Sequence, residues 1–250
     1  MNTIQLFINN ILGKKSIMNV DYDAQNFKLD IAAKREIKRA KEIFHETALL
    51  NKMFSHIKDG DIIYDVGANI GVISLLLSGT KSAKNTKVYS FEPEPKNFNQ
   101  LLKNIKLNNQ QDNIFPNQLA LGKEKGTLDL FVRGEAGEGR HSIAASKGST
   151  GTIKIDIETC SAFAASCGDS PDLVKIDVEG AEGQVLAGME SLFNDNKKPR
   201  DIFLEIHNKG DEDRMPDGKT TIDEWLTSRG YKLMWEQTRR SGSNRHYSLL

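Results

Sequence analysis

The stretch DIIYDVGANIGVISLLLSG, residues 61–79, constrains the fold of this chain more than any other. A short apolar run ends near Asp65, and a segment with two glycines, Gly67 and Gly71, follows it. A second apolar run comes next and stops at Gly79. The first run has the length and composition of a buried strand, and the second is long enough for a helix that ends at a glycine. A strand followed at once by a helix opens a layered α/β domain, so we expect this architecture.

The alternation of strands and helices continues along the chain. A strand is expected at 87–93, a helix at 95–109 and a further strand at 113–121, although Pro116 weakens the last of these. Strand, helix and strand in succession imply right-handed crossovers and a parallel sheet. The pattern resumes later, with a strand at 171–180, a helix at 181–193, a strand at 200–207, a helix at 221–230, and two closing antiparallel strands over YKLMWE and RHYSLL.

Residues 29–58 have a different pattern. Apolar residues recur there at helix-like intervals among lysines, arginines and glutamates, and Asp59-Gly60 ends the segment. We therefore predict a helical N-terminal cap over residues 1–58, with a short packing helix near its start. One Rossmann-like domain is expected to follow over residues 59–250.

An insertion into this domain is expected at about 122–157. GTLDLFV (126–132) and GTIKIDI (151–157) alternate apolar and polar residues, as the strands of a half-exposed hairpin do. The segment between them is rich in glycine and serine, which indicates a loop. This loop is either an ordinary solvated loop or one that binds an anionic or polyhydroxylated substrate. The candidate binding residues are Arg133, Arg140, His141 and Lys147.

Charge and cysteine content exclude several classes of protein. Lysine plus arginine number 34, as do aspartate plus glutamate, so nothing in the net charge favours nucleic acid or an anionic membrane. The two cysteines are too few for a disulfide scaffold or a cysteine zinc site. The apolar stretch at the N-terminus is short and its lysines follow it, which is the wrong order for a signal peptide. We expect a cytoplasmic protein without an integral membrane segment.

The glycine loop of the opening stretch points to a nucleotide without a pyrophosphate. Dinucleotide-binding loops read G-x-G-x-x-G, but here Asn69 stands where the middle glycine belongs, between Gly67 and Gly71. Asp65, just before the loop, would repel a pyrophosphate and attract a cationic amino acid group. Glu92 ends the next strand and is placed to accept hydrogen bonds from ribose hydroxyls. S-adenosylmethionine, an adenosine that carries an ammonium and a sulfonium, has these features; the alternative is a plain turn with a solvated glutamate.

Three motifs in order, DVGANIGVIS, FEPEPKNF and LVKIDVEGAEGQVLAG, resemble the FkbM-type methyltransferases, a family of S-adenosylmethionine-dependent O-methyltransferases. The resemblance runs from about residue 60 to residue 207. It implies a class I methyltransferase fold, which is α/β and Rossmann-like. This fold has a mostly parallel seven-stranded sheet with an antiparallel last strand, helices on both faces, and the cofactor over the carboxyl ends of the strands.

The resemblance also implies roles for particular residues. Those that match the cofactor motif and its ribose acid are Asp65, Gly67, Asn69, Gly71 and Glu92. Adenine would lie near residues 119–121, which offer no acidic side chain, so a hydrogen bond there would come from backbone or from Asn117. Gly183 departs from the expected pattern, because it stands where a good helix former is expected and costs up to about 1 kcal/mol of helix propensity.

The chemistry is expected at the ends of two later strands. In KIDVEG, Lys175, Asp177 and Glu179 share one face of the strand, and in DIFLEIH, Glu205 and His207 do the same. If the two strands are neighbours, Asp177, Glu205 and His207 converge where an open parallel sheet places its site. Either Asp177 or His207 would then take the proton from an acceptor hydroxyl, unless these are satisfied polar groups at strand ends. A divalent metal such as magnesium on the carboxylates is a weaker second way to acidify the hydroxyl.

We therefore expect an S-adenosylmethionine-dependent O-methyltransferase. Its acceptor would be a hydroxyl of a small molecule, a sugar or a lipid-linked saccharide, as the resemblance implies. The alternatives are a nicotinamide-dependent oxidoreductase and a non-catalytic nucleoside-binding protein on the same fold. Methylation of nucleic acid is disfavoured, since KIDVEG stands where an aromatic base-flipping motif would be. The sequence leaves the acceptor and the oligomeric state open.

Overall fold

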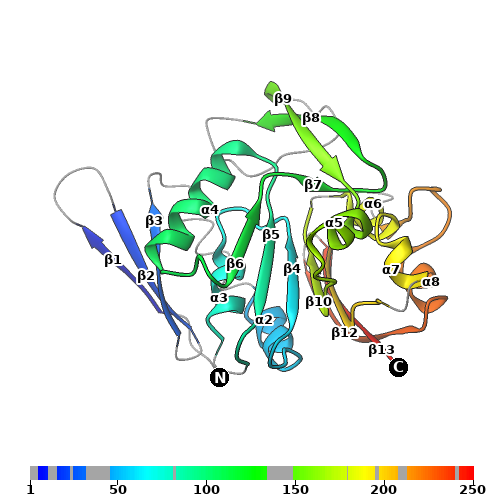
Figure 1. The fold of residues 1–250 in the computed structure, drawn as a ribbon, viewed down its shortest axis with the longest axis horizontal. Helices are drawn as coiled ribbons and strands as arrows, with labels where there is room; N and C mark the ends of the chain where they lie inside the picture. Colours follow the sequence, from blue (N-terminus) through cyan, green and yellow to red (C-terminus); the bar gives the residue numbers. More distant parts are fainter. Residues whose placement is uncertain are drawn as a thin grey trace.

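A seven-stranded sheet forms the centre of the molecule (Figure 1). The computed structural model describes residues 5–10, 16–22, 25–31, 46–80, 83–133, 149–178, 180–194, 197–207, 213–239 and 242–250. In spatial order, the strands of this sheet are β12 (Tyr231–Arg239), β13 (Gly242–Leu249), β11 (Asp201–His207), β10 (Leu173–Ile176), β4 (Ile62–Val66), β5 (Lys87–Phe91) and β6 (Ile114–Asn117). β13 runs antiparallel to both of its neighbours, β11 and β12, and the remaining neighbouring strands pair in parallel. The expected mostly parallel sheet with an antiparallel last strand is confirmed.

Helices cover both faces of this sheet (Figure 1). One face packs against α2 (Thr47–Phe54), α3 (Val72–Ser78) and α4 (Pro95–Leu107). The other packs against α5 (Cys160–Cys167), α6 (Glu182–Ala187), α7 (Glu190–Asn194) and α8 (Ile222–Thr227). The sequence patterns did not predict α5, although the Thr159 side chain caps its first turn and Gly168, with φ +82°, ends it.

Two expected elements are each divided in the structure. The strand expected at 113–121 is wrong as one element: β6 ends at Asn117, and β7 (Ala120–Leu121) belongs to a different sheet. The helix expected at 181–193 is divided into α6 and α7 around Gly188, where only glycine fits because the backbone oxygen of Gly122 lies 2.0 Å from where a Cβ would stand. The glycine at position 183 has the same explanation, since the backbone oxygen of Arg214 lies 2.3 Å from where its Cβ would stand.

The N-terminal part is a small sheet, so the packing helix expected at the start is wrong. Strands β1 (Gln5–Asn10), β2 (Ser16–Tyr22) and β3 (Gln25–Ile31) form an antiparallel meander beside α4 (Figure 1). Buried and more exposed side chains alternate along β3, which is the two-residue period of a strand. Residues 29–31 therefore belong to a strand, although their spacing with later apolar residues resembles that of a helix. Of the helix expected over 29–58, the part at 47–54 is confirmed, and residues 32–45 lie outside the described chain. The division at residue 58 stays a prediction.

The expected hairpin is present, while its bounds as an insertion at about 122–157 stay a prediction. Strands β8 (Gly126–Arg133) and β9 (Ser149–Glu158) pair antiparallel, and β7 joins them as a third strand. The structure does not describe the loop at 134–148 or the side chain of Arg133, so binding of a substrate by this loop stays a prediction. Across the described residues, no helix is both long and apolar enough to span a bilayer.

Candidate active site

A pocket of about 360 Å³ lies at the carboxyl ends of β4, β5 and β10. On one side, it is lined by the glycine loop and the end of β5, through Gly67, Asn69, Phe91 and Glu92. The hairpin insertion supplies an apolar wall, with Leu128, Leu130, Ile155 and Ile157. Residues 119–121, expected near adenine, also line the pocket, as does Asp177. The structure therefore gathers three of the five expected cofactor residues and one of the three expected catalytic residues around one cavity.

Gly67 fits between two strands with no room for a side chain. Its φ is +79°, and the backbone oxygen of Asp177 lies 1.9 Å from where a Cβ would stand. The amides of Gly67 and Ala68 both donate to the carbonyl of Phe91, at 3.0 Å each. The loop is thus held against β5 on one side and against the end of β10 on the other.

Replacing Gly67 by alanine should weaken binding of S-adenosylhomocysteine at least about tenfold, because the added methyl group must push the loop away from Asp177. Gly60→Ala is the matched control, since Gly60 has nearly the same φ, +80°, but nothing within 4 Å of its Cβ position. Both variants carry the left-handed strain of about 1–2 kcal/mol, and only Gly67→Ala adds the clash. Calorimetry should show nearly unchanged binding in Gly60→Ala; equal losses in both variants would contradict this account.

Glu92 is buried in the pocket wall and bridges the loop to the start of α4. Its carboxylate accepts from the amides of Asn69, at 2.8 Å, and Glu94, at 3.0 Å. Burial raises the pKa of Glu92 to about 7, although these amide hydrogen bonds oppose the shift. The side-chain amide of Asn97 also donates to it, at 3.5 Å, and a carboxylate has about four acceptor positions, so Glu92 retains capacity for a hydroxyl donor.

Gly71 and Asp65 lie behind the pocket rather than on its lining. At Gly71, with φ +88°, a Cβ would meet the Leu101 side chain at 2.3 Å, so this glycine lets α3 approach α4. Asp65 is fully buried, accepts a hydrogen bond from the Ser74 hydroxyl at 2.6 Å, and pairs with Lys175 at 3.1 Å. The charge of Asp65, expected to attract an ammonium group of the cofactor, is thus already paired within the protein. A direct contact of Asp65 with a cofactor stays a prediction.

Lys175 connects the glycine loop with the expected catalytic acids. Its buried ammonium lies 3.1 Å from Asp65 and 3.7 Å from Asp177, and it donates to the carbonyl of Gly67 at 3.2 Å. Burial lowers the pKa of Lys175, but the carboxylates of Asp65 and Asp177 outweigh this and raise it above its usual value. Lys175 therefore remains a cation that holds both carboxylates in place.

Asp177, Glu205 and His207 come together as expected from neighbouring strands. Each offers one atom, and the three atoms lie within 4.8 Å of one another. His207 lies 3.7 Å from Glu205 through Nε2 and 3.4 Å from Glu182 through Nδ1. Arg239 donates to Glu205 at 2.7 Å. Glu179, which shares the strand face in the sequence, lies outside the described residues.

Glu205 in this cluster and Glu46 near it have raised pKa values. Burial and the charge of Asp177 raise the pKa of Glu205 to about 7, while Arg239 opposes the shift. Burial and the charges of Asp177 and Glu205 raise the pKa of Glu46 to about 8. Glu46 precedes α2 and was not found from the sequence, because no spacing or motif links it to a site more than 130 residues away.

Comparisons with known proteins agree with this geometry. Residues 65–233 match the family model described as the methyltransferase FkbM domain. The chain is 27% identical over 193 residues to the hexuronic acid methyltransferase AglP of Haloferax volcanii, covering 77% of this chain and 75% of that protein. It is also 27% identical over 183 residues to methyltransferase 1 of Beauveria bassiana, covering 64% of this chain and 70% of that protein.

A solved structure has the same fold. The crystal structure of methyltransferase FkbM from Methylobacillus flagellatus KT superposes with a TM-score of 0.52 at 18% identity, over 77% of this chain. The chain spans 44% of the length of that protein. The family match covers more than half of the chain and includes the glycine loop, β10 and β11. The chain belongs to the FkbM methyltransferase family and is a methyltransferase.

Proposed function

We propose that this enzyme transfers a methyl group from S-adenosylmethionine to a hydroxyl of a sugar or of a small molecule. One observation carries the proposal: Glu92 and Asp177 line the same pocket. Glu92 supplies an acceptor for ribose hydroxyls, and Asp177 supplies a base beside the space where the methyl group would lie. The family assignment favours methyl transfer over the nicotinamide-dependent alternative.

The cofactor would lie along the glycine loop. Gly67 and Asn69 contribute the backbone of the loop and Glu92 contributes the ribose contact, while Phe91 and Leu119 give the adenine an apolar surface. Asn117, considered from the sequence as an adenine partner, donates through its side chain to the carbonyl of Phe115 at 2.8 Å. The adenine edge would then be read mainly by backbone groups near residues 119–121.

Binding of S-adenosylhomocysteine should release protons near neutral pH. With a pKa of about 7, Glu92 is about half protonated at pH 7, and ribose hydroxyls that donate to it favour the ionised form. Affinity should therefore rise between pH 6 and pH 8. Calorimetry in buffers of different ionisation enthalpy measures the number of protons released on binding. Glu92→Gln should abolish the protons released by the protein and leave only those released by the ligand. A wild-type release equal to that of the variant would contradict the assigned role of Glu92.

The transfer itself is an in-line displacement. S-adenosylmethionine would supply the methyl group: the acceptor oxygen would bond to the methyl carbon while the carbon–sulfur bond breaks with its electron pair going to sulfur, which would release S-adenosylhomocysteine. The hydroxyl proton goes to the carboxylate of Asp177, the one expected catalytic residue that lines the pocket. Lys175 holds this carboxylate, while Glu205 and His207 lie beside it.

A divalent cation is a second way to activate the hydroxyl. Asp177, Glu205 and His207 offer two carboxylates and an imidazole within reach of one ion, and magnesium prefers oxygen ligands. However, Lys175 and Arg239 already neutralise charge in this cluster, which favours the carboxylate base over the metal. Assays with a chelator and with added Mg²⁺ decide between them: activity that survives the chelator supports the base, and activity restored only by Mg²⁺ supports the metal.

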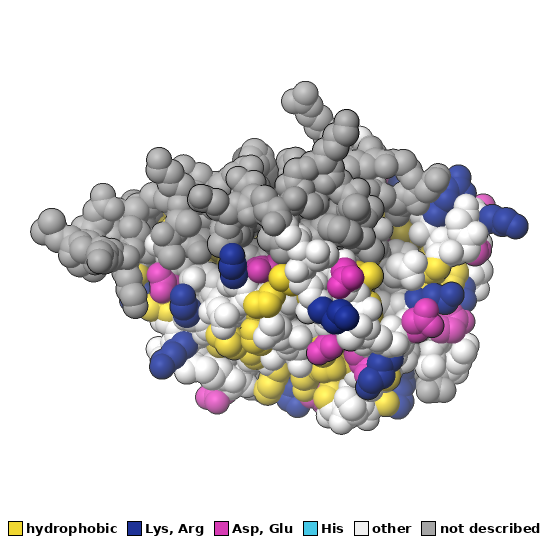
Figure 2. All heavy atoms as spheres, turned by 90° about the horizontal axis from the view of Figure 1, so that it is seen from above, with side chains coloured by type: hydrophobic (Ala, Val, Ile, Leu, Met, Phe, Trp, Pro, Cys, Tyr) yellow, Lys and Arg dark blue, Asp and Glu magenta, His cyan; other side chains and the backbone are white. Residues whose placement is uncertain are grey.

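For the acceptor, we propose a glycan hydroxyl, with a uronic acid as the first choice. The proposal is supported by the relative named as a hexuronic acid methyltransferase. On the described part of the face in Figure 2, basic and acidic side chains are interspersed rather than gathered in one basic stripe, which does not favour nucleic acid.

Transfer of a labelled methyl group tests this choice. Glucuronate and glucose glycosides, a lipid-linked saccharide and a transfer RNA would be compared at equal concentration. Transfer to the saccharides, with a preference for the uronic acid, is expected. Transfer to RNA alone would overturn the acceptor class.

A further inference from the structure

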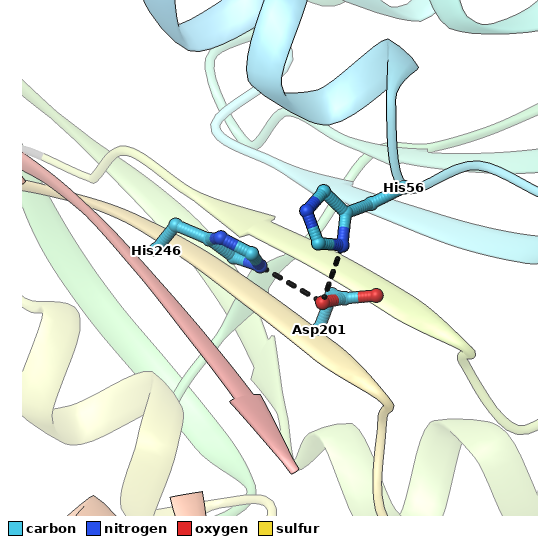
Figure 3. Close-up of side chains that lie close together, drawn as sticks. All are labelled: His56, Asp201 and His246. Atoms are coloured by element: carbon cyan, nitrogen blue, oxygen red, sulfur yellow. Dashed lines mark hydrogen bonds and ion pairs between the residues drawn. The ribbon is translucent and has the colours of Figure 1, made fainter. Parts of the chain in front are cut away.

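A second cluster of metal-ligating side chains lies at the opposite end of the central sheet. His56 follows α2, Asp201 is the first residue of β11, and His246 lies on β13 (Figure 3). His56 Nδ1 is 3.2 Å and His246 Nε2 is 2.8 Å from the same oxygen, Oδ1 of Asp201. The candidate active site uses the carboxyl ends of the strands, whereas Asp201 stands at the amino end of β11, so the two clusters are separate.

We propose that His56, Asp201 and His246 bind a zinc ion. Two imidazoles and one carboxylate are ligands that zinc takes at about 2.0–2.2 Å in tetrahedral sites, which places neighbouring ligand atoms roughly 3.3 Å apart. The separations of 3.2 and 2.8 Å approach this value, and the three ligand atoms lie within 4.8 Å of one another. Small side-chain adjustments would therefore admit the ion.

The surroundings hold these ligands in position. The second oxygen of Asp201 accepts from Arg200 Nε at 3.0 Å, and Asp61 pairs with the same guanidinium at 2.8 Å. The His246 ring stacks on Phe203, with centroids 4.2 Å apart and planes at 5°. Outer contacts of this kind orient the ligands of protein metal sites.

Access also favours a cation. Asp61 and Asp201 carry two negative charges, which face the guanidinium of Arg200, and the ammonium of Lys52 on α2 acts on His56. Asp201 and His246 are fully buried, but 27% of the His56 side chain is exposed. Solvent can therefore supply the entry path and a water as the fourth ligand.

Zinc here would fasten one end of α2 to the sheet. His56 lies just beyond the helix, while the other two ligands belong to paired strands, Asp201 on β11 and His246 on β13. An ion that binds the folded chain and not the unfolded chain raises stability by mass action. The expected effect is therefore on the stability of the fold and is independent of methyl transfer.

The test is a titration of metal-stripped full-length protein with Zn²⁺ against a chromogenic chelator, and with Co²⁺ followed by visible absorption. We expect one equivalent, tetrahedral cobalt bands, and a rise of Tm with zinc. His56→Gln is chosen because this side chain is partly exposed, so the variant should fold. It should weaken zinc binding at least about 100-fold, since even the loss of an outer contact costs 10–100-fold.

His207→Gln is the matched control, because it removes a histidine from the other cluster. Zinc affinity and the rise of Tm should be kept in this control and lost in His56→Gln. Two results would overturn the proposal: no binding by the stripped wild-type protein, which would leave the cluster as a hydrogen-bonded network, or zinc binding that depends on His207 and not on His56.

Discussion

Replacing Asp177 by asparagine should lower kcat about 100- to 10,000-fold, which is the range that a positioned general base contributes. Asparagine keeps the shape of the side chain but cannot take the hydroxyl proton. Lys175 remains paired with Asp65 in this variant, so the fold should persist. The affinity for S-adenosylhomocysteine should be nearly unchanged, because we assign the ribose contact to Glu92.

The measurement is methyl transfer under saturating cofactor, together with calorimetry on the same preparations. Asp156→Asn is the matched control, since Asp156 is an exposed aspartate on β9 and should leave kcat unchanged. If Asp177→Asn has a normal kcat, Asp177 is not the general base. A parallel loss of kcat and of binding would instead assign it to the cofactor site.

Replacing Lys175 by methionine should lower the free energy of unfolding by about 3–5 kcal/mol, the usual cost of leaving one member of a buried ion pair alone. Methionine fills a similar volume, but the fully buried Asp65 then loses its cation at 3.1 Å. The loop should also loosen, because Lys175 donates to the carbonyl of Gly67. Urea denaturation at pH 7 measures the loss.

Two further variants separate charge from packing. Lys125→Met breaks the ion pair with Glu158, in which the lysine is 79% exposed, and should leave stability unchanged because water screens that pair. Asp65→Asn combined with Lys175→Met removes both buried charges and should recover most of the lost stability. If the double variant is no more stable than Lys175→Met alone, the loss comes from packing and the ion-pair interpretation fails.

Most of the central fold could be predicted from the sequence because its signals are local. The apolar run of β4, the glycines after it and the helix that follows identify a βα unit without reference to other parts of the chain. Glu92 and Asp177 could be found as well, since each directly follows a strand, and parallel strands bring their carboxyl ends to one edge of the sheet. Glu205 and His207 followed by the same argument.

The parts that could not be predicted depend on contacts between distant segments. Glu46 comes near Asp177 and Glu205 because α2 packs against the sheet, and no sequence pattern encodes that packing. The need for glycine at 188 comes from the backbone of Gly122, and the strand β3 lies against α4, where Asn104 accepts from the amide of Asp30 at 2.9 Å. The pairing of Asp65 with Lys175 could have been considered, because the two residues are directly opposite each other in the register of the neighbouring parallel strands β4 and β10.

The central claim is that the pocket takes an S-adenosyl cofactor, and calorimetric titration of the wild-type protein tests it most directly. S-adenosylhomocysteine and NADH would be compared at pH 8, where Glu92, with its pKa of about 7, is mostly ionised. We predict saturable binding of S-adenosylhomocysteine at one site and no measurable binding of NADH. Absence of S-adenosylhomocysteine binding, or tighter binding of NADH, would contradict the account.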